Sequence, residues 1–282
     1  MRLGGRPERF LGRACRSSRI ENNLGMTSEP VGDVVERERA YYDGQDFTRG
    51  TAARARRLIQ RSLGEFNTFP ELFELFDARG KDALDYGCGR GYITVRLAEA
   101  GSSRVTGIDL SSVEIAQARE RAVAAGVADR ISFVAGDAHH TPFPDSSFDL
   151  IVGAAILHHL ELKSALLELK RLLRPDGEAI FVEPLRDNPI LRLGRLASPG
   201  ARTEDEHPLT PDDWDLCASI FSGFSHHERE FLSIPLMPLN LLLSARAQKV
   251  LARHVLAADE RTLARYPRLR KYARVTFLRF RS

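Results

Sequence analysis

The sequence predicts an α/β fold with a mostly parallel sheet, and three observations support this. Short apolar segments alternate with amphipathic segments between residues 79 and 184. A glycine-rich loop, Gly87-Cys88-Gly89-Arg90-Gly91, joins the first apolar segment to the next amphipathic one. Acids lie at or just after the ends of the first three apolar segments, at Asp85, Asp109 and Asp137. Strands that alternate with helices are typical of βαβ units, whose strands run parallel.

The N-terminal quarter of the chain precedes the first strong strand. Residues 1–30 show no apolar periodicity; of a transit peptide, a disordered tail and an extension upstream of a start at Met26, we favour the last two. Residues 31–282 are expected to form a single domain, in which 31–78 are a helical cap with an apolar face and pack over one edge of the sheet. Pro70 is expected to open a short helix there.

The central segment, 79–184, is the predicted cofactor-binding core. Strands are predicted at 82–86, 105–109, 131–135, 148–154 and 178–183, and helices at 92–100, 113–125 and 162–173. Gly101 and Gly126 are expected to end the first two helices and Ser112 to cap the second. Pro175-Asp176-Gly177 predicts a turn after the third.

The last segment, 185–282, is expected to carry the substrate side. It begins with a Pro-, Arg- and acid-rich excursion over 185–214, followed by a helix at 214–221. Two more strands are predicted at 227–233 and 273–280, with a helical insertion over 239–263 between them. Acceptor choice is expected to lie in 41–47, 185–214 and 234–266.

Charge is distributed unevenly along the chain. Residues 26–245 carry 24 Lys and Arg against 34 acids, whereas residues 246–282 carry eleven against two. The acidic body argues against a nucleic-acid groove, which needs a contiguous basic surface. The basic C-terminal segment is either a solvated helix face or a contact for an anionic partner, and residues 234–272 are a candidate for peripheral membrane or lipid contact.

Cysteine content and hydropathy indicate the compartment. Three widely spaced cysteines form no metal-ligand pair and predict no structural disulfide, as in a reducing compartment. No apolar run approaches the ~18 residues of a membrane span. We therefore expect a cytoplasmic protein. The oligomeric state cannot be predicted from these features.

The glycine loop and the acids define a binding site for a nucleotide-like cofactor. Glycines at a strand end let a ligand approach the backbone, and the following helix directs its amides at that ligand. The spacing G-x-G-x-G differs from the G-x-G-x-x-G of dinucleotide-binding folds. Asp109 can accept from ribose hydroxyls, Asp137 from an adenine amine, and Ala138 can offer its backbone amide. Two acids suit a cofactor with cationic parts better than a pyrophosphate.

These residues carry a resemblance to a known family. Residues 83–91, Ala-Leu-Asp-Tyr-Gly-Cys-Gly-Arg-Gly, resemble the first motif of the class I S-adenosylmethionine (SAM)-dependent methyltransferases. Residues 105–110, 136–138 and 148–160 resemble the second, third and fourth motifs. Residues 173–177 resemble the fifth, in which the family usually has Pro-Gly-Gly. The resemblance is strong over about 79–184 and implies a Rossmann-like, doubly wound sheet of seven strands with the last one antiparallel.

The same resemblance implies how SAM is bound. Asp85 and the loop from Gly87 through Gly89 to Gly91 approach the methionine part, Asp109 holds the ribose, and Asp137 with Ala138 holds the adenine. Tyr41 and Tyr42 belong to a segment that often closes the cofactor pocket in this family. The predicted cofactor site is completed by Cys88, Leu110 and Ala154.

Three residues are candidates for acid–base chemistry. His158 and His159 follow the fourth strand and Glu183 ends the fifth, so all three are expected at the cofactor edge of the sheet. Histidine, with a pKa near 6.5, suits removal of a proton from a hydroxyl. The alternative is that Leu157-His158-His159-Leu160 is a structural turn. No metal site is expected, because the side chains of adjacent histidines are expected to diverge and no i, i+4 pair with a carboxylate occurs.

The sequence therefore predicts a SAM-dependent methyltransferase acting at oxygen or carbon of a small molecule. Quinone, natural-product and lipid-like acceptors remain open. The main alternative is a non-catalytic cofactor-binding module or partner subunit with the same fold. A nicotinamide oxidoreductase is disfavoured by the glycine spacing, and an RNA methyltransferase by the acidic body.

Overall fold

The computed structural model describes residues 31–44, 58, 61–197 and 206–282. The expected tail, 1–30, lies outside these ranges. Parts of two expected acceptor segments, 45–47 and 198–205, also lie outside them.

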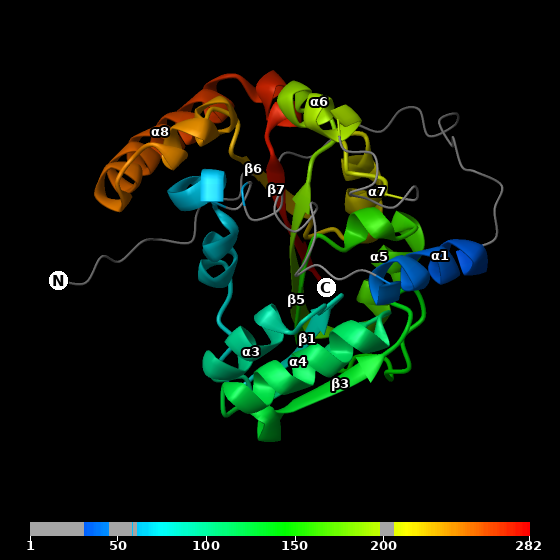
Figure 1. Ribbon diagram of the computed structural model, residues 1–282. Coiled ribbons are helices and arrows are strands. Elements are labelled where there is room, and N and C mark those ends of the chain that lie inside the picture. The colour runs from blue at the N-terminus through cyan, green and yellow to red at the C-terminus, as the bar shows by residue number, and fades with distance from the viewer. Residues whose placement is uncertain (1–30, 45–57, 59–60, 198–205) are drawn as a thin grey trace.

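A single seven-stranded sheet forms the centre of the described chain (Figure 1). Its order is β3-β2-β1-β4-β5-β7-β6, and only β7 runs antiparallel to its neighbours. The strands are β1 Asp82–Tyr86, β2 Arg104–Asp109, β3 Ile131–Ala135, β4 Phe148–Ala154, β5 Leu173–Pro184, β6 Ser225–Arg229 and β7 Val275–Arg281. This confirms the expected doubly wound, mostly parallel sheet with an antiparallel last strand. The order reverses between β1 and β4, and ligands of such sheets bind at the carboxyl ends of the strands near that point.

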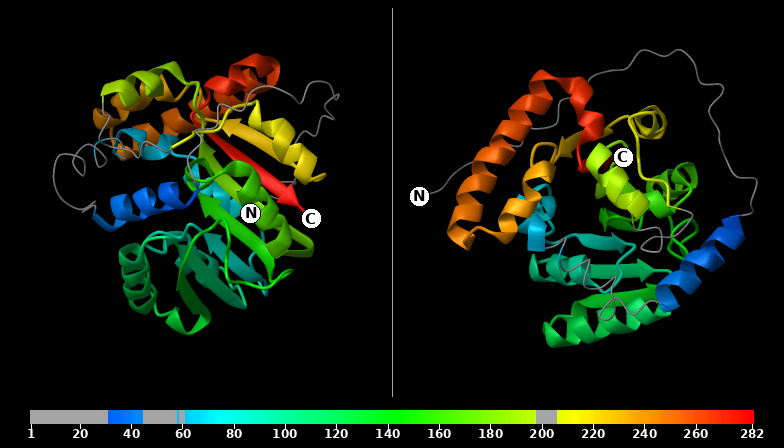
Figure 2. Two further views of the ribbon diagram at one scale, coloured as in Figure 1. Left: turned by 90° about the vertical axis from the view of Figure 1, so that its right-hand side faces the viewer. Right: turned by 45° about the horizontal axis from the view of Figure 1, so that its top comes forward.

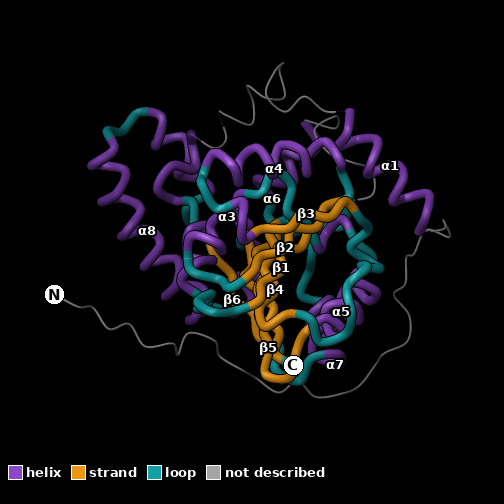
Figure 3. The backbone as a smooth tube through the Cα atoms, turned by 90° about the horizontal axis from the view of Figure 1, so that it is seen from below, coloured by secondary structure: helices purple, strands orange, loops and turns teal. Residues whose placement is uncertain are grey.

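Helices cover both faces of the sheet (Figure 3). One face packs against α3 Tyr92–Glu99 and α4 Ser112–Ala124, around buried Leu97 and Ile115. The other face packs against α5 Leu162–Leu172 and α7 Asp213–Ile220, around buried Leu166 and Cys217. The remaining helices are α1 Val31–Gly44, α6 Pro189–Ala197 and α8 Ala245–Arg265, and the main 3-10 helices are η1 Gly64–Phe66, η2 Phe69–Glu74, η6 Ile234–Leu241 and η7 Pro267–Tyr272.

The helix bounds of the core agree with expectation, with one correction at a cap. Ser111, not Ser112, caps α4, because its hydroxyl accepts from the Glu114 amide at 3.1 Å. Two serines stand together at this point of the sequence, so composition did not distinguish them. Gly101 has φ of +94° directly after the α3 C-cap, as expected for a glycine stop.

The predicted turn at Pro175-Asp176-Gly177 lies inside β5 instead of before it. Phe148 pairs with Leu173, and the next partners are Leu150 and Glu178, so the strand bulges between them. Asp176, at φ +64°, is in the bulge. Pairing with β4 therefore begins before the turn and resumes after it.

The N-terminal cap and the C-terminal insertion differ from long continuous helices. After α1 the described cap consists of short pieces, with Pro70 in the first turn of η2, as expected for proline. The insertion is η6 followed by α8, so the expected helical segment is divided at Leu242–Ser244. None of the described helices combines the length and apolarity that crossing a membrane requires.

Candidate functional site

The candidate site lies where β1, β2, β3 and β4 end. Figure 1 shows α1 beyond the arrowhead end of β3, on the side where these carboxyl ends meet. A hydrogen bond of 2.5 Å from the Ser111 hydroxyl to Asp43 Oδ1 ties α1 to the start of α4. The pre-sheet helix therefore lies over the carboxyl edge of the sheet.

The glycine loop follows β1 directly and requires glycine. Gly87, Gly89 and Gly91 all have positive φ, and a Cβ on Gly87 would come within 2.5 Å of the Ile156 side chain. At Gly89, by contrast, a Cβ would meet only a Glu114 oxygen at 3.7 Å. The middle of the loop thus leaves space that a ligand can approach.

Asp109, at the end of β2, fastens the loop to the second strand. Its Oδ2 accepts from the Gly89 amide at 2.7 Å and its Oδ1 from the Ser111 amide at 3.0 Å. Burial raises the pKa of this carboxyl, against the opposing effect of the two amides. A carboxylate has about four acceptor positions, so Asp109 keeps capacity for a diol after binding both amides.

Asp85 is fully buried below the loop. Its Oδ2 accepts from the Thr94 hydroxyl at 2.5 Å, while Oδ1 has no hydrogen-bond partner among the described residues. Burial raises the pKa of Asp85 to about 7, although the Thr94 hydroxyl opposes this. A buried carboxylate oxygen without a partner is costly and suits a site that receives a cationic group.

Asp137, after β3, is oriented by His139. Its Oδ1 accepts from the His139 amide at 2.8 Å and lies 2.7 Å from His139 Nδ1. Because His139 Nε2 accepts from the Glu161 amide at 2.9 Å, Nδ1 carries the proton and donates to Asp137. Burial alone would raise the pKa of Asp137, but the bonds from His139 outweigh it and the pKa is lowered. Asp137 is thus held ionised, with Oδ2 left to accept from a ligand.

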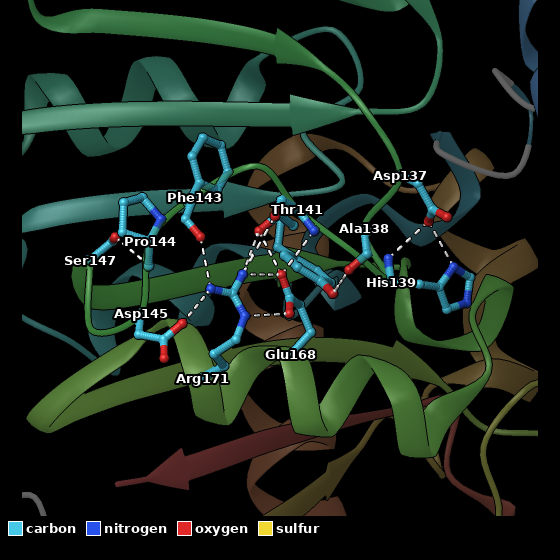
Figure 4. Close-up of polar contacts among 11 residues, drawn as sticks. Asp137, Ala138, His139, Thr141, Phe143, Pro144, Asp145, Ser147, Glu168 and Arg171 are labelled. Carbon is cyan, nitrogen blue, oxygen red and sulfur yellow. Dashed lines mark hydrogen bonds and ion pairs between the residues drawn. The ribbon is translucent and has the colours of Figure 1, made fainter.

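The loop that carries Asp137 and Ala138 is attached to α5 (Figure 4). Glu168 Oε1 accepts from both the amide and the hydroxyl of Thr141, at 2.8 and 2.6 Å. Arg171 pairs with Glu168 at 2.6 Å and also donates to the Phe143 carbonyl. The hydroxyl of Tyr86, the last residue of β1, donates to the Ala138 carbonyl. These contacts fix the position of Ala138 at the edge of the site.

Glu183 and His158 form a buried pair behind the end of β4. Glu183 is 0% exposed; its Oε1 accepts from the amides of Ile156 and Leu157, both at 2.9 Å, and its Oε2 lies 2.8 Å from His158 Nδ1. Both carboxylate oxygens are used in shaping the turn. This geometry favours a positioning role for Glu183 over the general base that the sequence suggested.

His159 joins the turn to α1. Its Nε2 lies 3.1 Å from the Tyr42 hydroxyl, and its Nδ1 lies 3.3 Å from Glu38 Oε2, an ion pair by distance without hydrogen-bond alignment. Burial alone would lower the pKa of His159, but Glu38, with Glu206 and Glu183, raises it above its ordinary value. Burial, together with Glu38, also raises the pKa of the Tyr42 phenol, which stays protonated.

The two histidines do not diverge, which corrects a premise of the sequence analysis. Their ring centroids lie 4.2 Å apart, and ligand atoms of His158, His159 and Glu206 lie within 4.8 Å of one another. Such a group matches the donor set of a divalent metal. However, both nitrogens of His159 already face Tyr42 and Glu38, so a metal would have to displace one of them.

The remaining predicted residues are less informative. Cys88 is buried, with its thiol pKa raised by burial, and Leu110 and Ala154 are half-buried at strand ends. Tyr41 lies edge-to-face on Tyr42, with ring centroids 5.2 Å apart. Sequence analysis did not single out Glu38, Glu206 or His139, because their relevance depends on contacts between distant segments. For His139, the His139-His140 doublet was the signal that the sequence offered.

Comparison with known proteins identifies the core. Residues 84–181 match the family model described as a methyltransferase domain. The chain is 39% identical over 99 residues to 27-O-demethylrifamycin SV methyltransferase of Amycolatopsis mediterranei, covering 35% of this chain and 36% of that protein. It is 38% identical over 106 residues to the ubiquinone/menaquinone biosynthesis C-methyltransferase UbiE of Paracoccus denitrificans, covering 37% and 42%. These matches span less than half of either relative.

Solved structures agree with the fold over more of the chain. Phosphoethanolamine N-methyltransferase 1 of Haemonchus contortus, solved with phosphoethanolamine and S-adenosylhomocysteine, matches with a TM-score of 0.57 at 18% identity, covering 90% of this chain and 50% of that one. A SAM-dependent methyltransferase from Mesorhizobium loti matches with a TM-score of 0.51 at 19% identity, covering 76% and 97%. At these identities the likeness concerns the fold.

Proposed function

Since residues 84–181 match the family model described as a methyltransferase domain, we propose that the protein is a class I SAM-dependent methyltransferase that transfers a methyl group from SAM to a small-molecule acceptor. The observation that carries this proposal is the set of acceptor atoms left at three adjacent strand ends. Asp85, Asp109 and Asp137 are each fixed by protein donors yet keep unused acceptor capacity.

The residues present fit SAM. We propose that Asp109 holds the ribose hydroxyls, that Asp137 and the Ala138 backbone hold the adenine, and that Asp85 with the Gly87–Gly91 loop faces the methionine part. The partnerless Oδ1 of Asp85 and the space beside Gly89 support the last assignment. Carboxylates with unused acceptor atoms suit a cationic cofactor better than a pyrophosphate. When bound, SAM supplies an electrophilic methyl group on a sulfonium.

His159 is the proposed general base, and the acceptor is proposed to be a hydroxyl compound. With Glu38 3.3 Å from Nδ1, the tautomer that carries its proton on Nδ1 leaves Nε2 as an acceptor, and the present neighbour of Nε2 is the Tyr42 hydroxyl. An acceptor hydroxyl that replaces or joins Tyr42 at Nε2 can transfer its proton there as oxygen attacks the methyl carbon. Glu38 orients the ring and stabilises the imidazolium that results. Alignment of the two reactants supplies most of the remaining rate acceleration.

The relatives support a small acceptor without selecting it. One of them is a 27-O-demethylrifamycin SV methyltransferase, and another is a C-methyltransferase of ubiquinone/menaquinone biosynthesis. For this chain, a hydroxyl acceptor is favoured over carbon because His159 Nε2 already contacts a hydroxyl, that of Tyr42. A C-methyltransferase with an already ionised acceptor would not need His159.

The proposal is tested by methyl transfer from labelled SAM to a panel of phenols, alcohols and quinols. We expect label in at least one hydroxyl compound, with kcat lowered about 100-fold or more in His159→Ala, as for loss of a general base. His254→Ala, on exposed α8, is the matched control and should retain activity. Tight SAM binding with no labelled product from any acceptor class would contradict the proposal and favour a non-catalytic module.

A further inference from the structure

The segment between β6 and the middle of α8 has an unusual combination of exposed apolar and basic residues. Between Glu230 and Asp259 the sequence contains no acidic residue. Leu242, at the corner between η6 and α8, is 83% exposed, the most exposed of the large apolar side chains in the described chain. The surface considered below consists of apolar Leu239, Leu241, Leu242 and Val250 and basic Arg246, Lys249 and Arg253, all exposed.

The basic residues lie on one face of α8. Arg246, Lys249, Val250 and Arg253 have the i, i+3, i+4, i+7 spacing that places side chains on the same side of a helix. Here no ion pair joins Arg246, Lys249 or Arg253 to any residue in the described part of the chain. This face therefore presents three cations that an anionic partner can meet.

The apolar corner is held rigidly to the body. Asn240 is buried and donates to the carbonyls of Ser62 and Leu63 at 2.9 and 2.8 Å. Gln248 donates to the carbonyls of Asn240 and Leu243, at 2.6 and 3.0 Å, which fixes η6 against the first turns of α8. Leu239 and Leu241, on either side of buried Asn240, are 42% and 40% exposed. Anchoring a corner so firmly while exposing its leucines indicates a contact surface and not a loose loop.

The C-terminal half of α8 attaches the helix to the body of the protein. Asp259 is buried and accepts from the amides of Glu230, Phe231 and Leu232, which attaches the helix to the end of β6. Ala252 and Leu263 are buried beneath it. Figure 1 and the right-hand view of Figure 2 show α8 on the opposite side of the molecule from α1, so this surface is separate from the candidate active site.

We propose that this surface, residues 239–253, docks the protein on an anionic lipid membrane. Leu239, Leu241 and Leu242 enter the boundary between headgroups and acyl chains, and the cationic face of α8 lies along the lipid phosphates. Apolar side chains for insertion and basic side chains for anionic headgroups, on one helical segment, are the features that interfacial binding requires. The acid-free stretch supplies the charge complementarity. This inference goes beyond methyl transfer and does not depend on it.

Vesicle co-sedimentation of the full chain tests the proposal. Wild type should bind vesicles of phosphatidylcholine mixed with phosphatidylglycerol and should bind pure phosphatidylcholine at least tenfold more weakly. Lys249→Glu should weaken binding to the anionic vesicles about fivefold or more, as expected for loss of a cation near a charged surface. Lys163→Glu, an exposed lysine on α5, is its matched control and should bind as wild type does.

The apolar part is tested separately. Leu242→Glu should weaken vesicle binding at least tenfold, whereas Val123→Glu, 68% exposed on α4, should leave it unchanged. Circular dichroism and affinity for S-adenosylhomocysteine, measured on each variant, distinguish misfolding or a failed cofactor site from loss of docking. Absence of vesicle binding by wild type, or equal binding by wild type and both surface variants, would overturn the proposal. A dimer dissociated by Leu242→Glu, without vesicle binding, would assign the surface to a second copy and also overturn it.

Discussion

Asp85 is the residue whose environment has the clearest energetic consequence. It is completely buried with one oxygen unpaired, and its pKa is raised to about 7. An acid with a pKa higher in the folded than in the unfolded chain stabilises the fold most below its unfolded pKa of about 3.9. That contribution is lost as pH rises through the folded pKa.

We therefore predict that Asp85→Asn changes the pH dependence of stability without cofactor. Wild type should lose as much as ~4 kcal/mol of unfolding free energy between pH 4 and pH 8 on account of this residue. In Asp85→Asn this loss should be absent, and the variant should be more stable than wild type at pH 8. Urea denaturation at a series of pH values measures both curves. Parallel curves for the two proteins would show that Asp85 is not the group responsible.

The contact between His159 and Glu38 predicts the pH profile of catalysis. A base must be neutral to accept a proton, so kcat/KM should rise with pH through the raised pKa of His159 and then level off. Glu38→Gln removes the anion 3.3 Å from Nδ1, so the rising limb of the kcat/KM profile should move to lower pH by about one unit. Glu36→Gln, exposed on the same helix, is the control and should leave the profile unchanged. A limb that does not move in Glu38→Gln would contradict the assignment.

At the scale of an element, the loop from Asp137 to Ser147 depends on its attachment to α5. Arg171→Met removes the bonds to Glu168 and to the Phe143 carbonyl and leaves the Glu168 carboxylate, 7% exposed, without its cation. We expect a loss of ~1–3 kcal/mol in unfolding free energy and faster amide exchange in this loop. Arg79→Met, which breaks a fully exposed pair with Asp77, should change the unfolding free energy much less, because solvent screens exposed pairs. Equal effects of the two changes would show that the attachment is not important.

The elements of the core could be predicted from sequence because their signals are local. The apolar runs of β1 to β4, the positive-φ glycines and the helix stops each depend on a few neighbouring residues. The bulge at Asp176 was missed because it depends on Phe148 pairing with Leu173, a contact between distant segments. The division of the insertion at Leu242–Ser244 likewise depends on Asn240 binding the backbone at Ser62 and Leu63.

The candidate site divides in the same way. The three strand-end acids were found because strand and loop lie next to each other in sequence. The roles of Glu38 and Glu206 could not be predicted, because α1 and the segment before Leu209 approach His158 and His159 only in the folded chain. Glu183 was placed correctly at the edge, but its two amide partners, which favour a positioning role, could not be seen before the turn was built.

The whole molecule combines an acidic α/β core with a basic, partly apolar C-terminal helix on the side opposite α1. This division separates the proposed cofactor and acceptor chemistry, at the carboxyl edge, from the proposed lipid contact on α8. Methyl transfer and docking should therefore be removable independently by mutation. The central claim, on which the proposed chemistry rests, is that the carboxyl edge binds SAM.

Calorimetric titration of S-adenosylhomocysteine into wild type, Asp109→Ala and Asp212→Ala tests that claim most directly. A lost hydrogen bond to a charged group costs roughly 1.5–3 kcal/mol, so Asp109→Ala should weaken binding about 10- to 100-fold. Asp212→Ala, an exposed acid at the start of α7 whose side chain makes no cap hydrogen bond, should bind as wild type does. Binding by wild type that falls only in Asp109→Ala is the predicted result. No binding by any of the three, or equal binding by all, would contradict the proposed SAM site.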